Sequence, residues 1–344
     1  MTTVDVLVIG AGQAGLAMGR ELARANRDFV IVDGASTVGE SWRRRWDSLR
    51  LFTPARHSSL PGLPFPADPD HLPDRDEVAR YLSDYLSHFG LPVRLDTAVR
   101  HLRQVDGGFQ AVTTQGGYIA RAVVVATGPF QRPAIPALTG GLEPDIAQLH
   151  AADYRNSDQL PEGPVLVVGS GNSGVQIADE LARTRPVVLA AGRRQPVLPQ
   201  RLLGRDVFSW LDQLRVMNIP ADSRIGRRMR ERDPLIGTGP RALRRTGVRV
   251  VDRVAGAVGR ALRTADGTMI EPATVIWATG YQPDYSWLDV PHAVGGDGWP
   301  QHTAGVSPIP RLHFLGLPYQ RTRGSALIGW VGTDAAYLGD RLAR

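Results

Sequence analysis

Two glycine-rich segments of this chain have the residue types and spacing that bind the pyrophosphate of a dinucleotide. The first is Gly10-Ala11-Gly12-Gln13-Ala14-Gly15 and the second is Gly169-Ser170-Gly171-Asn172-Ser173-Gly174. In this motif the first glycine allows a tight turn, the second lets the backbone approach the pyrophosphate, and the third lets a helix pack against a strand. The pyrophosphate accepts hydrogen bonds from the free N–H groups at the helix start. The sequence therefore predicts two dinucleotide sites.

The residues that follow the two motifs differ in charge where the adenosine ribose is bound. After the first motif, a strand-like run ends in Asp33 and Gly34, and a carboxylate here accepts hydrogen bonds from ribose hydroxyls and repels a 2′-phosphate. After the second motif, the matching run ends in Gly192, Arg193 and Arg194, and guanidinium groups bind a 2′-phosphate bidentately. The alternative for the two arginines is a solvated turn. The contrast predicts FAD at the first site and NADPH at the second.

Each motif is matched by a small-residue tripeptide further along the chain. These are Ala126-Thr127-Gly128 and Ala278-Thr279-Gly280. Each ends an apolar, strand-like run, so we expect it to return beside the bound dinucleotide, where a larger side chain would clash. The first tripeptide is then expected to contact FAD and the second to contact NADPH.

The elements that must position these residues alternate between strands and helices. This alternation predicts an α/β fold with two Rossmann-like dinucleotide-binding domains. Prolines after residue 128 mark a linker. We expect residues 1–132 and 281–344 to form the FAD domain, and residues 133–280 to form an inserted NADPH domain with a helical excursion at about 204–232. A last helix is expected from Asp334 to Leu342.

The composition excludes several classes of chemistry. The chain has no cysteine, which excludes disulfide oxidoreductases, iron–sulfur clusters and thiolate zinc sites, and no metal site is expected. All 40 basic residues are arginine, so lysine Schiff-base chemistry is excluded as well.

The charge and hydropathy patterns bear on partners and location. The formal net charge is +6, but the arginine-rich stretch at 224–249 has no interleaved aromatic residues, so no nucleic-acid partner is expected. No signal peptide and no apolar stretch long enough to span a bilayer is found in the sequence. We therefore expect a cytoplasmic protein with no membrane partner.

The chain resembles the flavin-containing monooxygenases, especially the bacterial CzcO-like and plant YUCCA-type enzymes. The resemblance covers nearly the whole chain and lies in both glycine motifs, both Ala-Thr-Gly tripeptides, and segments 39–49 and 324–332. It implies an oxidoreductase in which NADPH reduces FAD, and the reduced FAD reacts with dioxygen to a C4a-hydroperoxide. One oxygen atom would then enter a small organic substrate.

The resemblance also implies roles for residues outside the motifs. Ser41 and Trp42 would contact the flavin, and the backbone of Val99 would meet the adenine. Gly332 and Asp334 would belong to a helix start whose N–H groups face a flavin carbonyl, with ordinary helix capping as the alternative for Asp334.

Two residues are candidates for a part in the reaction itself. His150 is either a general acid or base, because histidine titrates near neutrality, or a structural residue between the two domains. Gln176 lies one helical turn after the second motif and would face the nicotinamide.

Three alternatives stay open at this point. A monooxygenase signature string is half present: His150 and Tyr154 match it, whereas Pro144 and Ile146 replace its phenylalanine and glycine. This departure favours an NADPH-dependent flavoprotein reductase or quinone-type oxidoreductase, and a third interpretation is a redox sensor that retains FAD.

The apolar segment 208–217 would be either a pocket wall or a subunit contact, which leaves a homodimer open.

Overall fold

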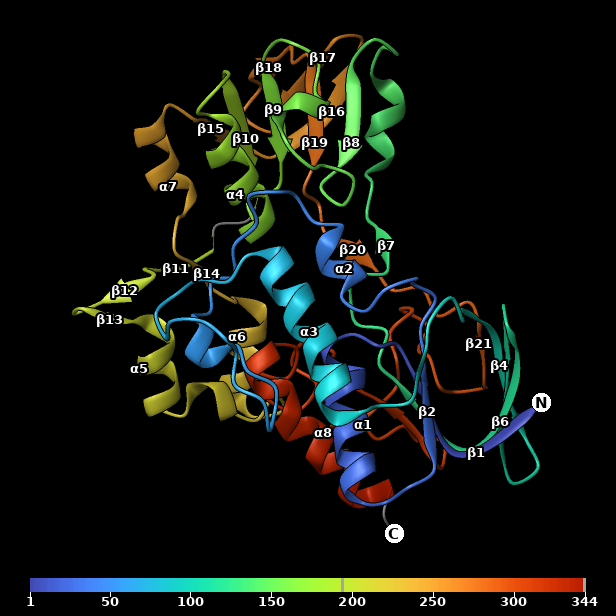
Figure 1. The fold of residues 1–344 in the computed structure, drawn as a ribbon. Coiled ribbons are helices and arrows are strands. Elements are labelled where there is room, and N and C mark those ends of the chain that lie inside the picture. Colours follow the sequence, from blue (N-terminus) through green and yellow to red (C-terminus); the bar gives the residue numbers. More distant parts are fainter. Residues whose placement is uncertain (193–194, 343–344) are drawn as a thin grey trace.

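The computed structural model describes residues 1–192 and 195–342, so Arg193 and Arg194 lie outside the described residues. Its main strands form two sheets, which occupy separate lobes in Figure 1. The first sheet has the strand order β21-β4-β5-β6-β1-β2-β3, with β22 beside β6, and the second has the order β15-β10-β9-β19-β8.

The first sheet is parallel around β1 and antiparallel at one side. β1 (Thr2–Ile9) pairs in parallel with β2 (Phe29–Val32) and β6 (Gly116–Val125), and these strands are apolar because both faces are covered. β4 (Val99–Val105), β5 (Gly108–Thr113) and β6 form an antiparallel meander. The remaining strands are β3 (Val93–Arg94), β21 (Leu288–Asp289) and β22 (Leu312–Phe314).

Three long helices lie together beside this sheet, to its left in Figure 1: α1 (Gln13–Arg24), α3 (Arg75–Phe89) and α8 (Ile328–Leu342). α3 begins with a capping box, in which the Asp74 side chain accepts hydrogen bonds from backbone N–H groups and the Glu77 side chain accepts one from the Asp74 backbone. The short elements α2 (Glu40–Arg43) and η1 (Ala55–His57) connect β2 to α3.

The second sheet is parallel throughout, as in a Rossmann fold. Its strands and their helices are β8 (Ala147–His150), β9 (Val165–Val168), α4 (Asn172–Leu181), β10 (Val187–Ala191), α7 (Pro240–Leu243), β15 (Arg249–Asp252) and β19 (Thr274–Trp277). The sequence-based expectation of an α/β fold with Rossmann-like parallel strands is confirmed.

The other elements are small. An antiparallel sheet contains β16 (Val254–Val258), β17 (Ala261–Thr264) and β18 (Met269–Ile270), and single 3₁₀ turns are η2 (Ala137–Gly141), η3 (Ser157–Gln159) and η5 (Arg244–Thr246). β7 (Arg132–Pro133) pairs antiparallel with β20 (Tyr281–Gln282), so the chain leaves and re-enters the first sheet's lobe side by side. In the described part of the chain, no helix is both long and apolar enough to cross a membrane.

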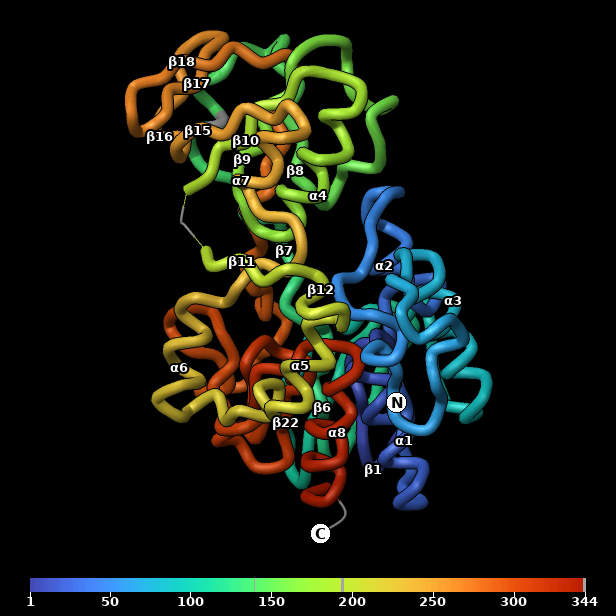
Figure 2. Tube along the Cα trace, turned by 90° about the vertical axis from the view of Figure 1, so that its left-hand side faces the viewer, coloured from blue at the N-terminus to red at the C-terminus, as the bar shows by residue number. Residues whose placement is uncertain are grey.

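Residues 195–239, which we call the excursion, leave the second sheet between β10 and β15 and pack against the first lobe (Figure 2). The excursion contains β11 (Val197–Leu198), β12 (Arg201–Leu202), β13 (Arg205–Asp206), α5 (Val207–Gln213), η4 (Val216–Asn218), α6 (Arg224–Glu231) and β14 (Leu235–Ile236). Phe208 and Met217 are buried in one cluster with Trp330 of α8, which favours a wall within the molecule over a subunit contact.

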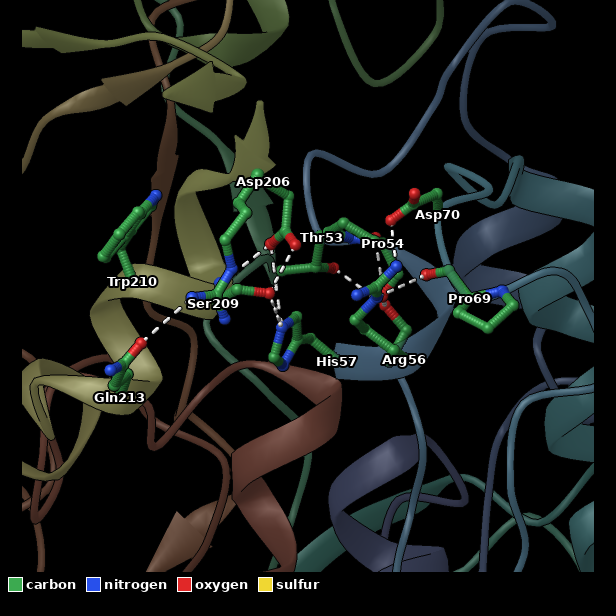
Figure 3. Close-up of polar contacts among 12 residues, drawn as sticks. Thr53, Pro54, Arg56, His57, Pro69, Asp70, Asp206, Ser209, Trp210 and Gln213 are labelled. Atoms are coloured by element: carbon green, nitrogen blue, oxygen red, sulfur yellow. Dashed lines mark hydrogen bonds and ion pairs between the residues drawn. The ribbon is translucent and has the colours of Figure 1, made fainter. Parts of the chain in front are cut away.

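A polar contact fixes α5 to the first lobe (Figure 3). Asp206 caps α5, because its carboxylate accepts hydrogen bonds from the Ser209 backbone N at 2.8 Å and the Ser209 hydroxyl at 2.5 Å. The His57 Nε2 lies 3.3 Å from the Ser209 Oγ and 3.6 Å from the Asp206 Oδ1. The His57 ring also stacks on Trp330 at a centroid distance of 5.8 Å.

The last helix differs from expectation. α8 begins at Ile328, so Asp334 lies inside the helix and the prediction that the helix begins there is wrong. Two glycines early in α8 weaken the helical pattern of the sequence. They are there because the helix is packed closely: a Cβ on Gly329 would overlap the carbonyl oxygen of His57, and one on Gly332 would overlap the ring of Pro61.

Candidate functional site

One cavity of about 840 Å³ reaches from the first glycine motif to the second. Most of the residues expected to bind the first dinucleotide line it, namely Gly10, Gly12, Gln13, Ala14, Asp33, Gly34, Ser41, Trp42, Val99, Ala126, Thr127 and Gly128. Residues expected at the second site line it as well, namely Gly171, Asn172, Ser173, Ala278 and Gly280. Both His150 and Gln176 also face this cavity.

The remaining described candidates do not line the cavity. They are Gly15, Gly169, Ser170, Gly174, Thr279, Gly332 and Asp334. Gly15, Gly169 and Gly174 have packing roles, and the Thr279 hydroxyl donates a hydrogen bond to the carbonyl oxygen of Ala134 at 2.5 Å.

The first motif is held against its tripeptide by backbone contact. Gly10 has a φ of +108°, and a Cβ there would lie 2.6 Å from the carbonyl oxygen of Ala126. A Cβ on Gly15 would overlap the carbonyl oxygen of Gly10. The Ala126 N–H donates to the carbonyl oxygen of Ile9 at 2.8 Å, which carries the β1–β6 pairing into the turn.

The second motif repeats this geometry. Gly169 has a φ of +113°, and a Cβ there would overlap the carbonyl oxygen of Ala278. A Cβ on Gly174 would overlap the carbonyl oxygen of Gly169, and the Ala278 N–H donates to Val168 at 2.8 Å. The two tripeptides therefore meet the two motifs in the same way.

The middle glycine of each motif faces open space. A Cβ on Gly12 or on Gly171 would meet no heavy atom within 4 Å, and both residues line the cavity. A side chain at either position would fill the space in front of a helix start, at α1 or α4, where the pyrophosphate of a dinucleotide would be bound. The residues present therefore fit a dinucleotide at each motif.

Asp33 is fixed at the carboxyl end of β2. Its Oδ2 accepts a hydrogen bond from the Ala11 N–H at 2.6 Å, and its Oδ1 accepts one from the Ala35 N–H at 2.8 Å. These contacts hold the carboxylate beside the first motif and in the cavity wall, where the ribose contact is expected.

The start of α8 lies in the cavity wall, whereas Gly332 and Asp334 do not. Ala326, Leu327 and Ile328 line the cavity, and Gln13 Nε2 donates to the Ala326 carbonyl oxygen at 2.9 Å. Asp334 is fully buried and its Oδ1 accepts a hydrogen bond from Arg321 Nε at 2.8 Å. The helix start that was expected to face the cavity is therefore present, but it lies several residues earlier.

His150 has both ring nitrogens engaged. Its Nε2 donates to the Gly280 carbonyl oxygen at 3.0 Å, and its Nδ1 accepts from the Ala152 N–H at 3.0 Å. Burial lowers the pKa of His150 below its usual value, although the bond to Gly280 opposes this shift. A neutral ring with no free nitrogen favours the structural interpretation over the acid–base one.

Side chains on α4 tie it to the segment between α2 and η1. Gln176 Nε2 donates to the Arg50 carbonyl oxygen at 3.3 Å, and Glu180 accepts hydrogen bonds from Tyr154 at 2.8 Å and Ser48 at 2.5 Å. Both cavity walls are therefore linked beside the second motif.

Arg45 is a cavity residue that contacts both segments of the chain that connect the two lobes, one before β7 and one at β20. Its guanidinium donates to the Tyr281 hydroxyl at 2.5 Å and lies 5.0 Å from the ring centroid of Phe130. Cation–π contacts of this kind fix a guanidinium without neutralising its charge.

Two residues with suitable chemistry are not among the site residues predicted from the sequence, which selected Trp42 and not Trp46. Trp46 is 3% exposed and lines the cavity beside Trp42, and its indole N–H has no hydrogen-bond partner among the described residues. Arg253 follows β15, and its Cβ lies 3.6 Å from the position of a Cβ on Gly192. Arg253 lies beside Gly192 because β15 pairs with β10, and the local sequence does not predict that pairing.

The two substituted signature positions lie away from the cavity. Ile146 is buried in the core of the second sheet, and neither Pro144 nor Ile146 lines the cavity. Within residues 1–192 and 195–342, no group of three or more acidic or histidine side chains could hold a metal ion.

Comparisons with known proteins agree with this geometry. A family model described as pyridine nucleotide-disulphide oxidoreductase matches residues 7–214. An uncharacterized CzcO-like oxidoreductase of Geobacillus kaustophilus is 45% identical over 337 residues, 97% of each chain. The probable indole-3-pyruvate monooxygenase YUCCA9 of Arabidopsis thaliana is 27% identical, over 88% of this chain and 80% of its own. A solved flavin-containing monooxygenase from Stenotrophomonas maltophilia has a TM-score of 0.84 and 29% identity, and the match covers 99% of this chain and 98% of that one.

Proposed function

This chain belongs to the flavin-containing monooxygenase family, and from that premise we propose that it is an NADPH-dependent FAD monooxygenase acting on a small organic substrate. It would insert one atom of dioxygen into that substrate. The observation that carries the proposal is the single cavity that reaches both glycine motifs, because a hydride must pass directly from one dinucleotide to the other.

The first motif would hold FAD. Gly12 leaves room for the pyrophosphate at the start of α1, and Asp33 would accept hydrogen bonds from the ribose. When bound, FAD accepts a hydride from NADPH and activates dioxygen, which is chemistry that side chains do not supply. The start of α8 directs the positive end of a helix dipole at the cavity, where it would stabilise negative charge on the reduced ring.

The second motif would hold NADPH in an inserted domain at residues 133–280. Gly171 leaves the matching room at α4, and no acid follows β10. Arg193 and Arg194 would bind the 2′-phosphate, and Arg253 supports this assignment because the β10–β15 pairing brings its side chain beside Gly192, at the carboxyl end of β10.

Other residues would position the reacting groups and exclude water. Leu49, Leu51, Phe52 and Ile236 give the cavity an apolar wall, which strengthens electrostatic contacts inside it. His150 holds the Gly280 carbonyl oxygen, and therefore the turn after β19, through its Nε2 proton.

A flavoprotein reductase that does not insert oxygen is the second candidate. Its support is the replacement of two signature residues, but Pro144 and Ile146 lie outside the cavity. The disulfide chemistry in the name of the matching family model is excluded, because the chain contains no cysteine.

The test measures oxygen transfer directly. The FAD-loaded protein is incubated with NADPH, ¹⁸O₂ and a panel of thioethers, and sulfoxide, hydrogen peroxide and NADPH consumption are quantified. We expect ¹⁸O-labelled sulfoxide and a higher rate with NADPH than with NADH. NADPH consumption matched only by hydrogen peroxide, with no labelled product from any probe, would support the reductase instead.

A further inference from the structure

Three side chains form a polar group in the cavity wall that neither dinucleotide site accounts for. Asp233 comes from the excursion, and Tyr319 and Arg323 come from the segment before α8; all three line the cavity. We call them the polar trio. The Asp233 Oδ1 accepts a hydrogen bond from the Tyr319 hydroxyl at 2.8 Å and one from Arg323 Nη2 at 3.0 Å.

Arg323 is committed to holding Asp233 and is not available as a phosphate ligand. Its side chain is 7% exposed, Nη2 contacts Asp233 and Nη1 contacts the Met217 sulfur at 3.2 Å. Its Nε is buried without a hydrogen-bond partner among the described residues. Asp233 is 49% exposed by contrast, and its Oδ2 accepts no hydrogen bond from the part of the chain that the structure describes.

The backbone at Tyr319 is held in an unfavourable conformation. Its φ is +53°, in the left-handed region that a bulky side chain rarely adopts. Such strain persists only where the surroundings enforce it, and it is concentrated at ligand-binding positions. Here the residue in this conformation is the one whose hydroxyl donates to the Asp233 carboxylate.

The polar trio lies between the two motifs. On one side, the Ile236 N–H contacts Asn172 Oδ1, at the start of α4, at 3.4 Å. On the other side, a Cβ on Gly316 would lie 2.7 Å from the Ala14 Cβ, at the start of α1. The segments that carry the trio therefore lie against both helix starts, in the region where the two redox groups would meet.

The chemistry that the trio offers is that of a hydrogen-bond acceptor. Arg323 balances the charge of Asp233, so the pair does not require a cationic ligand, and Oδ2 is open to a donor. The neighbouring cavity residues Pro234, Ile236, Pro318 and Leu327 are apolar.

We propose that Asp233 determines substrate specificity by accepting a hydrogen bond from a neutral O–H or N–H group on an otherwise apolar substrate. This inference rests on the proposed function, because it places that substrate beside the two redox groups. Tyr319 and Arg323 are positioning residues that fix the carboxylate.

The test compares two probes that differ by one donor, para-(methylthio)phenol and its methyl ether. Their dissociation constants are measured on the oxidised, FAD-loaded protein without NADPH, from the change in flavin absorbance. We expect the wild-type protein to bind the phenol about tenfold more tightly, and Asp233→Asn to bring the two constants within about twofold. Asp222→Asn, an exposed acid on the same excursion, is the matched control and should leave the preference unchanged.

Asp233→Glu serves as a second variant, because it keeps the charge beside Arg323 but moves the carboxylate oxygens. The Asp233→Glu variant should prefer the phenol over its methyl ether less strongly than the wild type does, and its melting temperature should stay close to that of the wild type. An absent preference in the wild type, or one that survives Asp233→Asn, would overturn the inference. Weaker NADP⁺ binding in Asp233→Asn with an intact phenol preference would also overturn it, because the carboxylate would then bind a ribose hydroxyl. Tight phenol binding without oxygen transfer would instead count against the proposed function alone.

Discussion

The three glycines of each glycine motif have different surroundings. The outer two are required by the protein itself, since a Cβ on Gly10 or Gly15 would meet backbone carbonyl oxygens. The protein itself does not require the middle glycine, since a Cβ on Gly12 or Gly171 would meet nothing within 4 Å, so only a bound ligand would exclude a side chain there. Folding and binding can therefore be separated at neighbouring residues.

We therefore expect a substitution at Gly12 to weaken ligand binding without unfolding the protein, and a substitution at Gly10 to lower the stability of the fold. Gly12→Val should leave the melting temperature of the apoprotein unchanged but weaken FAD binding by at least about tenfold, because pyrophosphate hydrogen bonds are lost. Gly171→Val should keep FAD and raise the dissociation constant of NADP⁺ instead. Gly10→Ala, the contrasting variant, should destabilise the fold by about 1–3 kcal/mol through overpacking. Normal FAD content in Gly12→Val would contradict the assignment.

Arg253 allows a test of the 2′-phosphate site from a second strand. Arg253→Gln should weaken binding of 2′,5′-ADP by about tenfold and leave 5′-AMP unchanged, because only the former carries the extra phosphate. Arg249→Gln, on the exposed opposite end of β15, is the control and should bind both as the wild type does. Titration calorimetry measures the dissociation constants of both ligands for the wild type and for the two variants. Equal losses for both ligands would show that Arg253 does not bind the 2′-phosphate.

Residues within a motif could be predicted from the sequence, but residues brought in from other elements could not. The motif glycines, Asp33 and the Ala-Thr-Gly tripeptides are identified by local spacing, and the structure places most of them in the wall of one cavity. Arg253 and Asp233 each depend on a neighbour that is distant in the chain. No local pattern encodes such a neighbour.

At the scale of elements, α5 depends on one cap and one histidine from another lobe. Asp206→Ala removes the bonds to Ser209 and the partner of His57, and should destabilise α5 by about 1–2 kcal/mol. Limited proteolysis should then cleave within residues 195–239 faster than in the wild type. Asp212→Ala, an exposed acid on the same helix, is the control. Equal cleavage rates in the two variants would mean that the cap does not hold the excursion.

Continuous apolar runs matched their predictions, and an element fixed by tertiary contacts did not. β2 and β10 end where the sequence predicts, directly before Asp33 and Gly192. The start of α8 was missed because Gly329 and Gly332 lower its helical propensity and are present only for packing against η1 and Pro61.

For the whole molecule, buried histidines make stability depend on pH. Burial lowers the pKa of His57, His150, His302 and His313, and that of His313 falls to about 4. The unfolded chain binds these protons near pH 6.5, so the free energy of unfolding should fall as the pH decreases from 6.5 toward 4. The contribution of His313 alone is roughly 3 kcal/mol.

Thermal unfolding of the FAD-loaded protein between pH 7.5 and 4.5 measures this loss. His313→Gln should flatten the pH dependence, whereas His88→Gln, on the exposed side of α3, should not alter it. A pH dependence identical in His313→Gln and the wild type would rule out a contribution from that histidine.

The order of the two nucleotide units could be predicted from the duplicated motifs, but the path of the excursion could not. Its arginine-rich sequence suggested a helical region and gave no indication that Asp233 and Ile236 would reach the cavity. Its position depends on contacts with Phe52, Thr322 and Trp330, which lie far away in the chain.

The excursion leaves and rejoins the second sheet between two adjacent strands, yet its side chains form part of the chamber between the lobes. We therefore expect residues 195–239 to be exchangeable as a unit between related proteins. Replacing residues 195–239 as a unit during evolution would change which substrates the chamber between the lobes accepts, and would leave both glycine motifs unchanged. A chimera carrying the corresponding segment of a relative should inherit the donor's choice of substrate and keep the recipient's coenzymes.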